Sequence, residues 1–197
     1  MKAVLLSGGI DSIAIAYWQR PEVAVTIDYG QLAAAAEIRA ASSVAKELSL
    51  EHRIIQVDCR QLGRGQMARK RQVTGAPSPV WWPYRNQLLV TLAAMQLVGA
   101  GVDELMIGCV RGDDLHSDGR EDFFRAIDQL LQMQEFSLRL TAPAIGMTTV
   151  ELVHKSRVPQ DILAWAHSCH CGELACGTCR GCRRHRETFR CLGFPEY

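Results

Sequence analysis

A short segment near the start of the sequence has the residue types that bind phosphate: Ser7-Gly8-Gly9-Ile10-Asp11-Ser12. Its glycines let the backbone approach an anion closely, and its serines add hydroxyl donors. A helix that begins at Asp11 or Ser12 would direct free N–H groups and the positive end of its dipole at the same anion. Asp11 suits such a site only where a Mg²⁺ ion or a backbone cap holds it. The alternative is a plain strand-to-helix turn, and the Gly-Lys-Ser/Thr ending of a Walker A loop is absent.

Six of the eight cysteines lie near the end of the sequence, and their spacing is that of a zinc site. Cys176, Cys179 and Cys182 form a double Cys-x-x-Cys, and each such turn can deliver two thiolates to one Zn²⁺ ion. A tetrahedral site needs one more ligand, for which Cys169 and Cys171 compete. Four protein ligands leave no open position for water, so we expect a structural zinc. Reactive or disulfide-linked thiols are the alternative, although no secretory signal is visible.

The elements that would position these clusters alternate between strands and helices. Strands are expected at residues 3–6, 23–27, 53–57 and 104–107, and helices at 11–17, 33–50, 86–98 and 121–134. This alternation predicts an α/β fold, a Rossmann-like parallel sheet with helices on both faces. Ligands of such sheets bind beyond the carboxyl ends of the strands. Residues 60–80, with mixed charge, Gly and Pro, are expected to form a flexible lid or loop.

The bulk composition limits the class of protein. A length of 197 residues fits one domain, and a net charge of +1 gives no strong field for nucleic acid or an anionic membrane. No apolar run approaches the ~18 residues of a membrane span. We therefore expect one globular domain in the reducing cytoplasm, with no membrane partner and no nucleic acid partner.

Taken together, the phosphate loop and the terminal cysteines resemble the 7-cyano-7-deazaguanine synthase (QueC) family of N-type PP-loop ATP-pyrophosphatases. Further segments similar to that family are Asp28-Tyr29-Gly30-Gln31, Pro83-Tyr84-Arg85-Asn86, Gly108-Cys109-Val110, Asp118-Gly-Arg120-x-x-Phe123 and Ala142-Pro143. The resemblance spans essentially the whole chain, as one PP-loop domain over residues 1–197. It implies a zinc-binding segment within that domain at residues 165–191, and it favours Cys169 over Cys171 as the fourth ligand.

The resemblance implies an ATP-dependent C–N ligase that forms AMP and pyrophosphate. A typical member uses ATP and Mg²⁺ to adenylate the carboxylate of 7-carboxy-7-deazaguanine. Ammonia then displaces AMP to give the amide, and a second activation gives the nitrile. Family members often dimerise, so a homodimer is expected.

It also implies roles for individual residues. Expected ATP contacts are Ser7, Gly8, Gly9, Ile10, Asp11 and Ser12; expected catalytic residues are Asp11, Ser12, Arg85 and Arg120; expected substrate contacts are Tyr29, Gln31, Arg85, Asn86, Asp114 and Asp118. The fork of Arg85 suits phosphate and carboxylate alike, and carboxylates accept hydrogen bonds from purine-like N–H groups. The alternative is that Arg85 is a surface charge at a helix start and that Asp113, Asp114 and Asp118 are solvated loop acids.

Three features depart from the family pattern. Leu32-Ala33-Ala34-Ala35-Ala36 stands where the family usually has Arg-His, Thr149 stands where a lysine is expected, and the chain is short. These losses suggest an alternative: a QueC-like ligase that joins the activated deazaguanine to a protein amine, for example in an antiviral defence system. The alanines would then form an apolar wall with room for a larger nucleophile.

Two hypotheses of a different kind lie outside this chemistry. The first is another PP-loop enzyme, a tRNA thiolase or an amidotransferase-like synthetase, and a thiolase would need reactive cysteines or an iron–sulfur cluster. A non-catalytic zinc-knuckle binding module would use the basic run Arg180, Arg183, Arg184, His185, Arg186 and Arg190. We expect this run to be the solvated face of a terminal helix instead.

Overall fold

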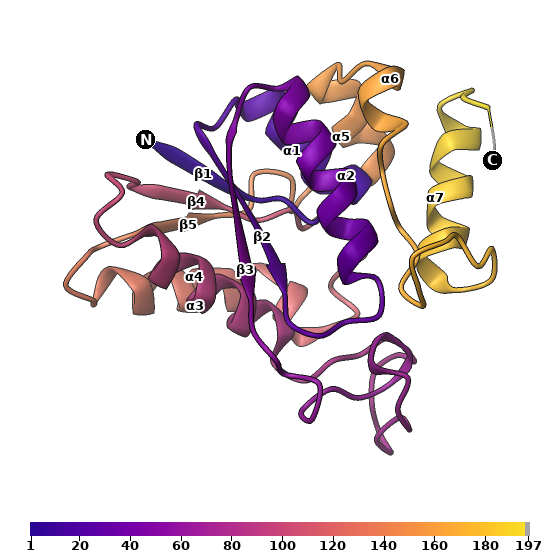
Figure 1. Cartoon of the computed structure of the whole chain (residues 1–197), viewed down its shortest axis with the longest axis horizontal. Coiled ribbons are helices and arrows are strands. Elements are labelled where there is room, and N and C mark those ends of the chain that lie inside the picture. Colours follow the sequence, from indigo (N-terminus) through magenta and orange to yellow (C-terminus); the bar gives the residue numbers. More distant parts are fainter. Residues whose placement is uncertain (196–197) are drawn as a thin grey trace.

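Five parallel strands form the central sheet of the protein, which we describe from a computed structural model over residues 1–195 (Figure 1). The strand order is β3-β2-β1-β4-β5. The strands are β1 (Lys2–Leu5), β2 (Val23–Asp28), β3 (Glu51–Gln56), β4 (Glu104–Met106) and β5 (Arg139–Thr141). The predicted α/β fold is confirmed, and β1 lies in the middle of the sheet, so the loop that follows β1 is central too.

Helices cover both faces of this sheet (Figure 1). They are α1 (Ile10–Gln19), α2 (Ala34–Glu47), α3 (Arg85–Leu97), α4 (Glu121–Gln132), α5 (Thr149–Ser156), α6 (Gln160–Leu163) and α7 (Arg180–Cys191), with 3₁₀ turns η1 (Gln66–Ala68) and η2 (Ser117–Gly119). Helices α1, α2, α5 and α6 lie on one face, and α3 and α4 lie on the other. None of these helices has the length and apolar character that a membrane span requires.

Alternate residues of β1 separate the two hydrophobic cores. Val4 packs with the layer of α1, α2 and α5, whereas Ala3 and Leu5 pack with the layer of α3 and α4. This alternation is the two-residue period of a strand that is buried on both faces. Both cores therefore meet at β1, and its carboxyl end opens between the two layers.

Residues 60–80 form a loop with one 3₁₀ turn, and the loop is anchored to the core. Met67, Val80 and Trp82 are buried against the α3 side of the sheet. Trp82 meets Tyr29 edge to face, with ring centroids 4.8 Å apart. The loop therefore covers the end of β2 as part of the packed structure.

Candidate active site

The phosphate loop turns from β1 into α1, and its geometry requires glycine at position 8. Gly8 has a φ of +75°, and a Cβ there would lie 2.8 Å from both the Glu37 carbonyl oxygen and the Ala40 Cβ of α2. Ser12 donates from Oγ to the carbonyl of Gly9 (3.0 Å), and its Oγ lies 3.2 Å from Ser7 Oγ. The N-terminus of α1 has no side-chain cap. Its first N–H groups are thus available to an anion.

A cavity of ≈ 290 Å³ lies above this loop, between the two helix layers. The ends of three strands form its floor, represented by Leu5, Ile27 and Ile107. Its walls come from the phosphate loop, the start of α3, the loop after β4 and residues 167–188. This is the edge of the sheet at which parallel α/β folds bind their ligands.

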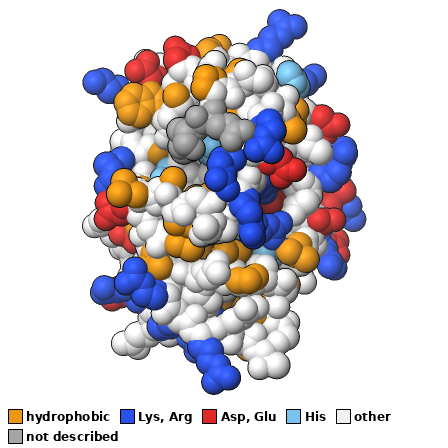
Figure 2. All heavy atoms as spheres, turned by 90° about the vertical axis from the view of Figure 1, so that its right-hand side faces the viewer, with side chains coloured by type: hydrophobic (Ala, Val, Ile, Leu, Met, Phe, Trp, Pro, Cys, Tyr) orange, Lys and Arg blue, Asp and Glu red, His pale blue; other side chains and the backbone are white. Residues whose placement is uncertain are grey.

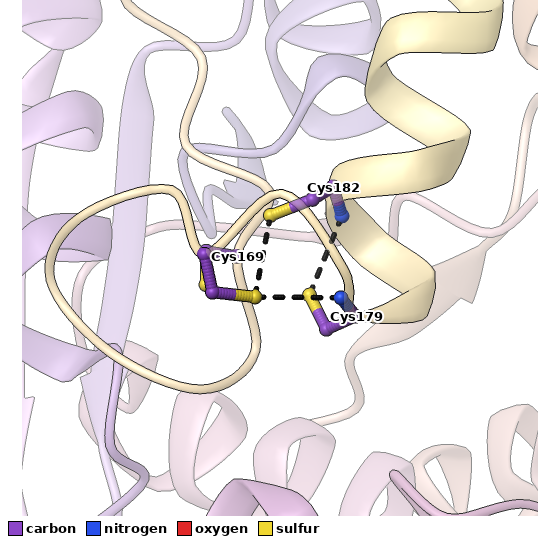
Figure 3. Close-up of side chains that lie close together, drawn as sticks. Cys169, Cys179 and Cys182 are labelled. Atoms are coloured by element: carbon purple, nitrogen blue, oxygen red, sulfur yellow. Dashed lines mark hydrogen bonds between the residues drawn. The ribbon is translucent and has the colours of Figure 1, made fainter.

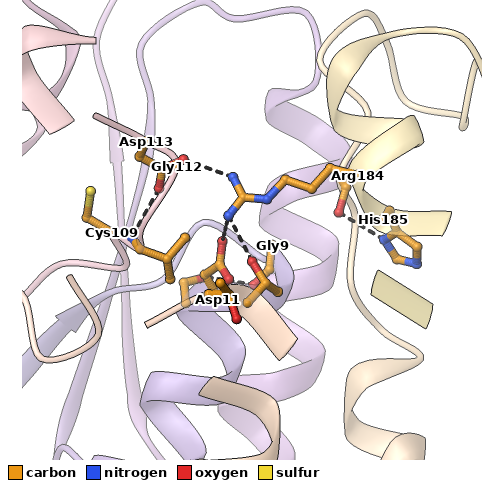
Figure 4. Close-up of polar contacts among 12 residues, drawn as sticks. Gly9, Asp11, Cys109, Gly112, Asp113, Arg184 and His185 are labelled. Carbon is orange, nitrogen blue, oxygen red and sulfur yellow. Dashed lines mark hydrogen bonds and ion pairs between the residues drawn. The ribbon is translucent and has the colours of Figure 1, made fainter. Parts of the chain in front are cut away.

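On one side of the cavity, a single guanidinium group joins three side chains (Figure 4). Arg184 of α7 donates from Nη2 to Asp11 Oδ2 (3.2 Å) and to Thr149 Oγ1 (2.8 Å). It also donates from Nη1 to Asp113 Oδ1 at 2.8 Å. Burial raises the pKa of Asp11, and the Arg184 charge opposes that rise. Within the described residues, Asp11 Oδ1 is buried and lacks a hydrogen-bond partner. A buried oxygen of this kind can coordinate a cation.

Another part of the cavity lining combines Arg85 and Asn86 of α3 with Tyr29 and with Glu37 of α2. Arg85 begins α3, and its Nη1 lies 3.5 Å from the sulfur of Met67. Glu37 Oε2 accepts a hydrogen bond from Gln31 Nε2 at 2.8 Å. Burial raises the pKa values of Glu37 and Tyr29, while the nearby Arg85 charge lowers both. This part of the lining therefore offers a cation, an amide and a carboxyl group to one ligand.

Cysteine sulfurs lie together beside this cavity, and Figure 3 labels three of the residues, Cys169, Cys179 and Cys182. The Sγ atoms of Cys169, Cys176, Cys179 and Cys182 are all within 4.8 Å of one another. Four sulfurs around one Zn²⁺ ion would be about 3.8 Å apart, because Zn–S bonds are about 2.3 Å. Backbone N–H groups of Cys179 and Thr178 lower the pKa of the Cys176 thiol, which favours the thiolate that a metal needs. The four sulfurs fit a zinc ion, and Cys171 is outside the set.

The segment that carries these cysteines also forms a wall of the cavity. His167 donates its backbone N–H to the carbonyl of Gly8 at 2.8 Å, so the segment touches the phosphate loop directly. Ser168, His170 and Arg180 line the cavity as well. Burial lowers the pKa of His170 to about 4, which keeps its ring neutral near pH 7. The cysteine cluster thus lies behind a wall of the site.

The expectation that the basic run of α7 is a solvated face is only partly right. Figure 2 views the molecule from the side of α7 and shows Lys and Arg side chains on this surface close to acidic ones. Arg183 and Arg186 are exposed, but Arg184 turns inward to Asp11. His185 is buried and stacks on Phe189, with ring centroids 4.4 Å apart.

Comparison with known proteins agrees with this arrangement. A sequence profile described as "Queuosine biosynthesis protein QueC" matches residues 2–193. The chain belongs to the QueC family. A protein of Methanosarcina mazei is 29% identical, with 100% of this chain and 96% of that protein covered. Proteins of Desulforudis audaxviator and Methanoculleus marisnigri are each 33% identical, with 96% and 99% of this chain and 96% of each relative covered. All three are named 7-cyano-7-deazaguanine synthase.

The alignment with the Methanosarcina mazei relative extends over 226 positions, more than the 197 residues of this chain. That relative therefore contains residues without a counterpart here. This difference agrees with the expectation that the chain is short for the QueC family.

Most of the residues that the family resemblance singled out converge on the cavity. Those that line it are Ser7, Gly9, Ile10, Asp11, Ser12, Tyr29, Arg85 and Asn86. Gly8 does not line the cavity, and its role is to let the loop pass close to α2. Expected ATP contacts and expected substrate contacts thus line the same cavity.

Gln31 and Asp118 do not line this cavity, because their polar groups are used within the protein. Gln31 accepts from the Tyr29 N–H at 2.9 Å and donates to the Ile27 carbonyl at 3.1 Å. Asp118 Oδ2 accepts from the Asn86 N–H at 3.1 Å and so caps the start of α3. Both residues hold a neighbour that does line the cavity, namely Tyr29 and Asn86.

Asp114 and Arg120 are exposed and also lie outside the cavity lining. Arg120 Nε donates to the Asp114 carbonyl at 3.1 Å, which ties the loop before α4 together. The acidic residue that this loop presents to the cavity is Asp113.

The alanine segment does not form the apolar wall expected from the sequence. Ala33, Ala34 and Ala36 are 0%, 8% and 5% exposed and lie outside the cavity lining. The residue that α2 presents to the cavity is Glu37.

Among the polar residues that line the cavity, the sequence assigned no role in the site to Glu37, Asp113, Thr149 or Arg184. One pattern could have indicated Arg184. Cys182, His185 and Phe189 recur at helical spacing and mark the buried face of α7, and Arg184 lies at the edge of that face.

Proposed function

We propose that this protein uses ATP to adenylate the carboxylate of 7-carboxy-7-deazaguanine and, with ammonia, converts it to the nitrile. The observation that carries the proposal is one cavity with a phosphate loop on one side and Arg85, Asn86 and Tyr29 on the other. The named activity of the relatives points the same way.

The loop would bind the ATP phosphates. The uncapped N–H groups of α1 and the hydroxyls of Ser7 and Ser12 are aligned donors for phosphate oxygens. Arg85 would hold the substrate carboxylate, since a guanidinium matches its two oxygens. A carboxylate is a poor electrophile, and transfer of AMP to its oxygen creates a good leaving group. Positioning the two reactants in one cavity supplies much of the rate.

Asp11 and Asp113 are the residues that would hold Mg²⁺. The buried, unpaired Asp11 Oδ1 fits a hard cation that prefers oxygen ligands. When bound, Mg²⁺ neutralises charge on the phosphates that leave.

The four cysteines would hold Zn²⁺ in a structural role, because four thiolates complete a tetrahedral site. Because the cysteines lie behind the cavity wall, the metal would hold residues 167–188 against the phosphate loop. Following the family resemblance, we also propose a homodimer, which analytical ultracentrifugation would test.

The function is tested by incubating the protein with ATP, Mg²⁺ and 7-carboxy-7-deazaguanine, with and without ammonium, and following AMP, amide and nitrile by mass spectrometry. We expect nitrile only with ammonium. Arg85→Ala should lower the rate by about 100-fold, while Arg71→Ala, an exposed arginine outside the cavity, should not change it.

Either of two contrary outcomes would change the proposal. AMP formation without amide or nitrile in the presence of ammonium would indicate a different acceptor, such as a protein amine. No AMP under any condition would contradict adenylation of this substrate.

A further inference from the structure

The phosphate loop contains no lysine or arginine, although ATP brings several negative charges to it. Among residues 1–195, the lysine and arginine side chains that line the cavity are Arg85, Arg180 and Arg184. Arg85 lies on α3, on one face of the sheet, and Arg184 contacts α1 and α5 on the other. The two sides of the cavity therefore each have their own arginine.

The geometry of the displacement reaction indicates which reactant lies on each side of the cavity. In a displacement at phosphorus, the attacking oxygen and the leaving oxygen lie roughly in line on opposite sides of the phosphorus atom. If Arg85 holds the attacking carboxylate, pyrophosphate leaves toward the side of Arg184. We propose that Arg184 binds the β- and γ-phosphates of ATP and stabilises the pyrophosphate as it leaves. This inference rests on the proposed function. It gives a role in the site to a residue that we expected from the sequence to lie on a solvated face.

The contacts of Arg184 fit such a role. A guanidinium has five N–H donors, and the bonds to Asp11, Asp113 and Thr149 use three of them. The other two have no partner among the described residues, and the side chain is 35% exposed at the cavity. The residue is thus held in place by its neighbours and retains donors for an anion.

Thr149 adds a second, independent observation. It stands where the sequence pattern led us to expect a lysine, and its hydroxyl accepts the hydrogen bond from Arg184 at 2.8 Å. A cation therefore reaches this position from α7 instead of α5. Arg184 lies two residues after Cys182, so the cysteine cluster sets its location.

A purely structural role is the competing explanation, in which Arg184 only fastens α7 to α1. The two roles differ in ligand selectivity. A phosphate-binding arginine contributes to the binding of ATP and pyrophosphate, whereas AMP, which lacks the β- and γ-phosphates, does not touch it. A structural brace would affect all three ligands alike or none of them.

The experiment measures the dissociation constants of ATP, pyrophosphate and AMP by calorimetry with Mg²⁺ present. The variants are Arg184→Met, which keeps the aliphatic stem, Arg184→Lys, which keeps the charge, and Arg183→Ala, an exposed control on the same helix. Zinc content and thermal midpoint are recorded for each variant. We expect Arg184→Met to weaken ATP and pyrophosphate about tenfold or more and AMP less than about threefold. Arg184→Lys should recover part of the loss, and Arg183→Ala should match the wild type.

Unchanged ATP and pyrophosphate binding in Arg184→Met would overturn the proposal. So would equal weakening of all three ligands in Arg184→Lys with zinc content and thermal midpoint intact. Arg184→Lys decides the question if Arg184→Met does not fold. If the wild-type protein bound no ATP, the proposed function itself would be contradicted. Failure of the proposed function can therefore be distinguished from failure of the role proposed for Arg184.

Discussion

Glu37 is a carboxyl group in an unusual place for a site that binds anions. It lines the cavity, and burial raises its pKa above the ordinary value of 4.5. Gln31 donates to one of its oxygens, and no bond within residues 1–195 involves the other. Burial makes Glu37 easier to protonate than an exposed glutamate, and its ionised form can accept a proton from an attacking amine.

Glu37→Gln should therefore change how stability depends on pH. The folded state binds the Glu37 proton more tightly than the unfolded state does, so this group costs stability progressively as pH rises above 4.5. A glutamine keeps an oxygen for Gln31 and removes the titration. We expect the variant to gain stability relative to the wild type as the pH rises above 4.5, as measured by urea unfolding at each pH.

The matched control is Glu47→Gln, which makes the same substitution at an exposed position of the same helix. A difference between Glu37→Gln and the wild type that stays constant with pH would show that Glu37 titrates alike in the folded and unfolded states.

Gly8→Ala tests the close approach of the phosphate loop to α2. The added Cβ meets the Glu37 carbonyl and the Ala40 Cβ at 2.8 Å, in addition to the cost of a positive φ. The φ cost alone is about 1–2 kcal/mol. We expect a loss of unfolding free energy larger than that cost, and weaker ATP binding by about tenfold or more.

Gly75→Ala is the control for backbone strain, because Gly75 has a φ of +83° and nothing within 4 Å of the added Cβ. If both variants lose the same stability and both bind ATP normally, the contact with α2 is not what requires glycine at position 8.

At the scale of elements, α7 and the cysteine cluster act as one unit beside the phosphate loop. Cys176→Ser removes a proposed zinc ligand whose side chain is exposed, so it disturbs the cysteine cluster with little loss of core packing. We expect loss of the zinc, faster proteolysis within residues 165–191, and at least about tenfold weaker ATP binding, because Arg184 and His167 lose their support. Metal analysis, limited proteolysis and calorimetry measure these effects.

Cys191→Ser is the matched control, since Cys191 is an exposed thiol at the end of α7 outside the four-sulfur set. Full zinc content in Cys176→Ser would exclude Cys176 as a ligand. Normal ATP binding after complete zinc loss would separate the metal from the phosphate site.

The elements predicted correctly are those whose own sequence carries a clear pattern. Strands β1 to β4 are short apolar or β-branched runs, and α1 to α4 have helical periodicity. Strand β5 has three residues, Arg139–Thr141, and only its pairing with β4 makes it a strand. Helix α6 has four residues, too few for any period.

The parts of the site that the sequence could predict are likewise those with a pattern in one stretch of the chain. The phosphate loop is one contiguous motif, and the cysteine spacing limits the metal ligands to a few candidates. Arg184 and Asp11 are 173 residues apart in the chain, so only the fold brings them together. Asp118 and Asn86 match family motifs, but the cap that joins them depends on how two loops meet.

At the scale of the whole molecule, the cavity lies between parts of the protein that are far apart in the sequence. Its walls come from both helix layers and from residues 167–188, so one ATP molecule would contact all three. A ligand that binds only the folded state at 100 times its dissociation constant adds about 2.7 kcal/mol to stability. We therefore expect Mg²⁺-ATP to raise the free energy of unfolding by about that amount in zinc-loaded protein.

Urea unfolding, followed by tryptophan fluorescence and by far-ultraviolet circular dichroism, measures this effect with and without ATP. The tryptophans report different regions, since Trp82 lies in the core on the α3 side while Trp18 packs against the core on the other side. Coincident transitions that shift together on addition of ATP would mean that the ligand stabilises both layers and the cysteine segment as one cooperative unit. Two separated transitions, of which ATP shifts only one, would contradict this and would identify the layer that holds the nucleotide.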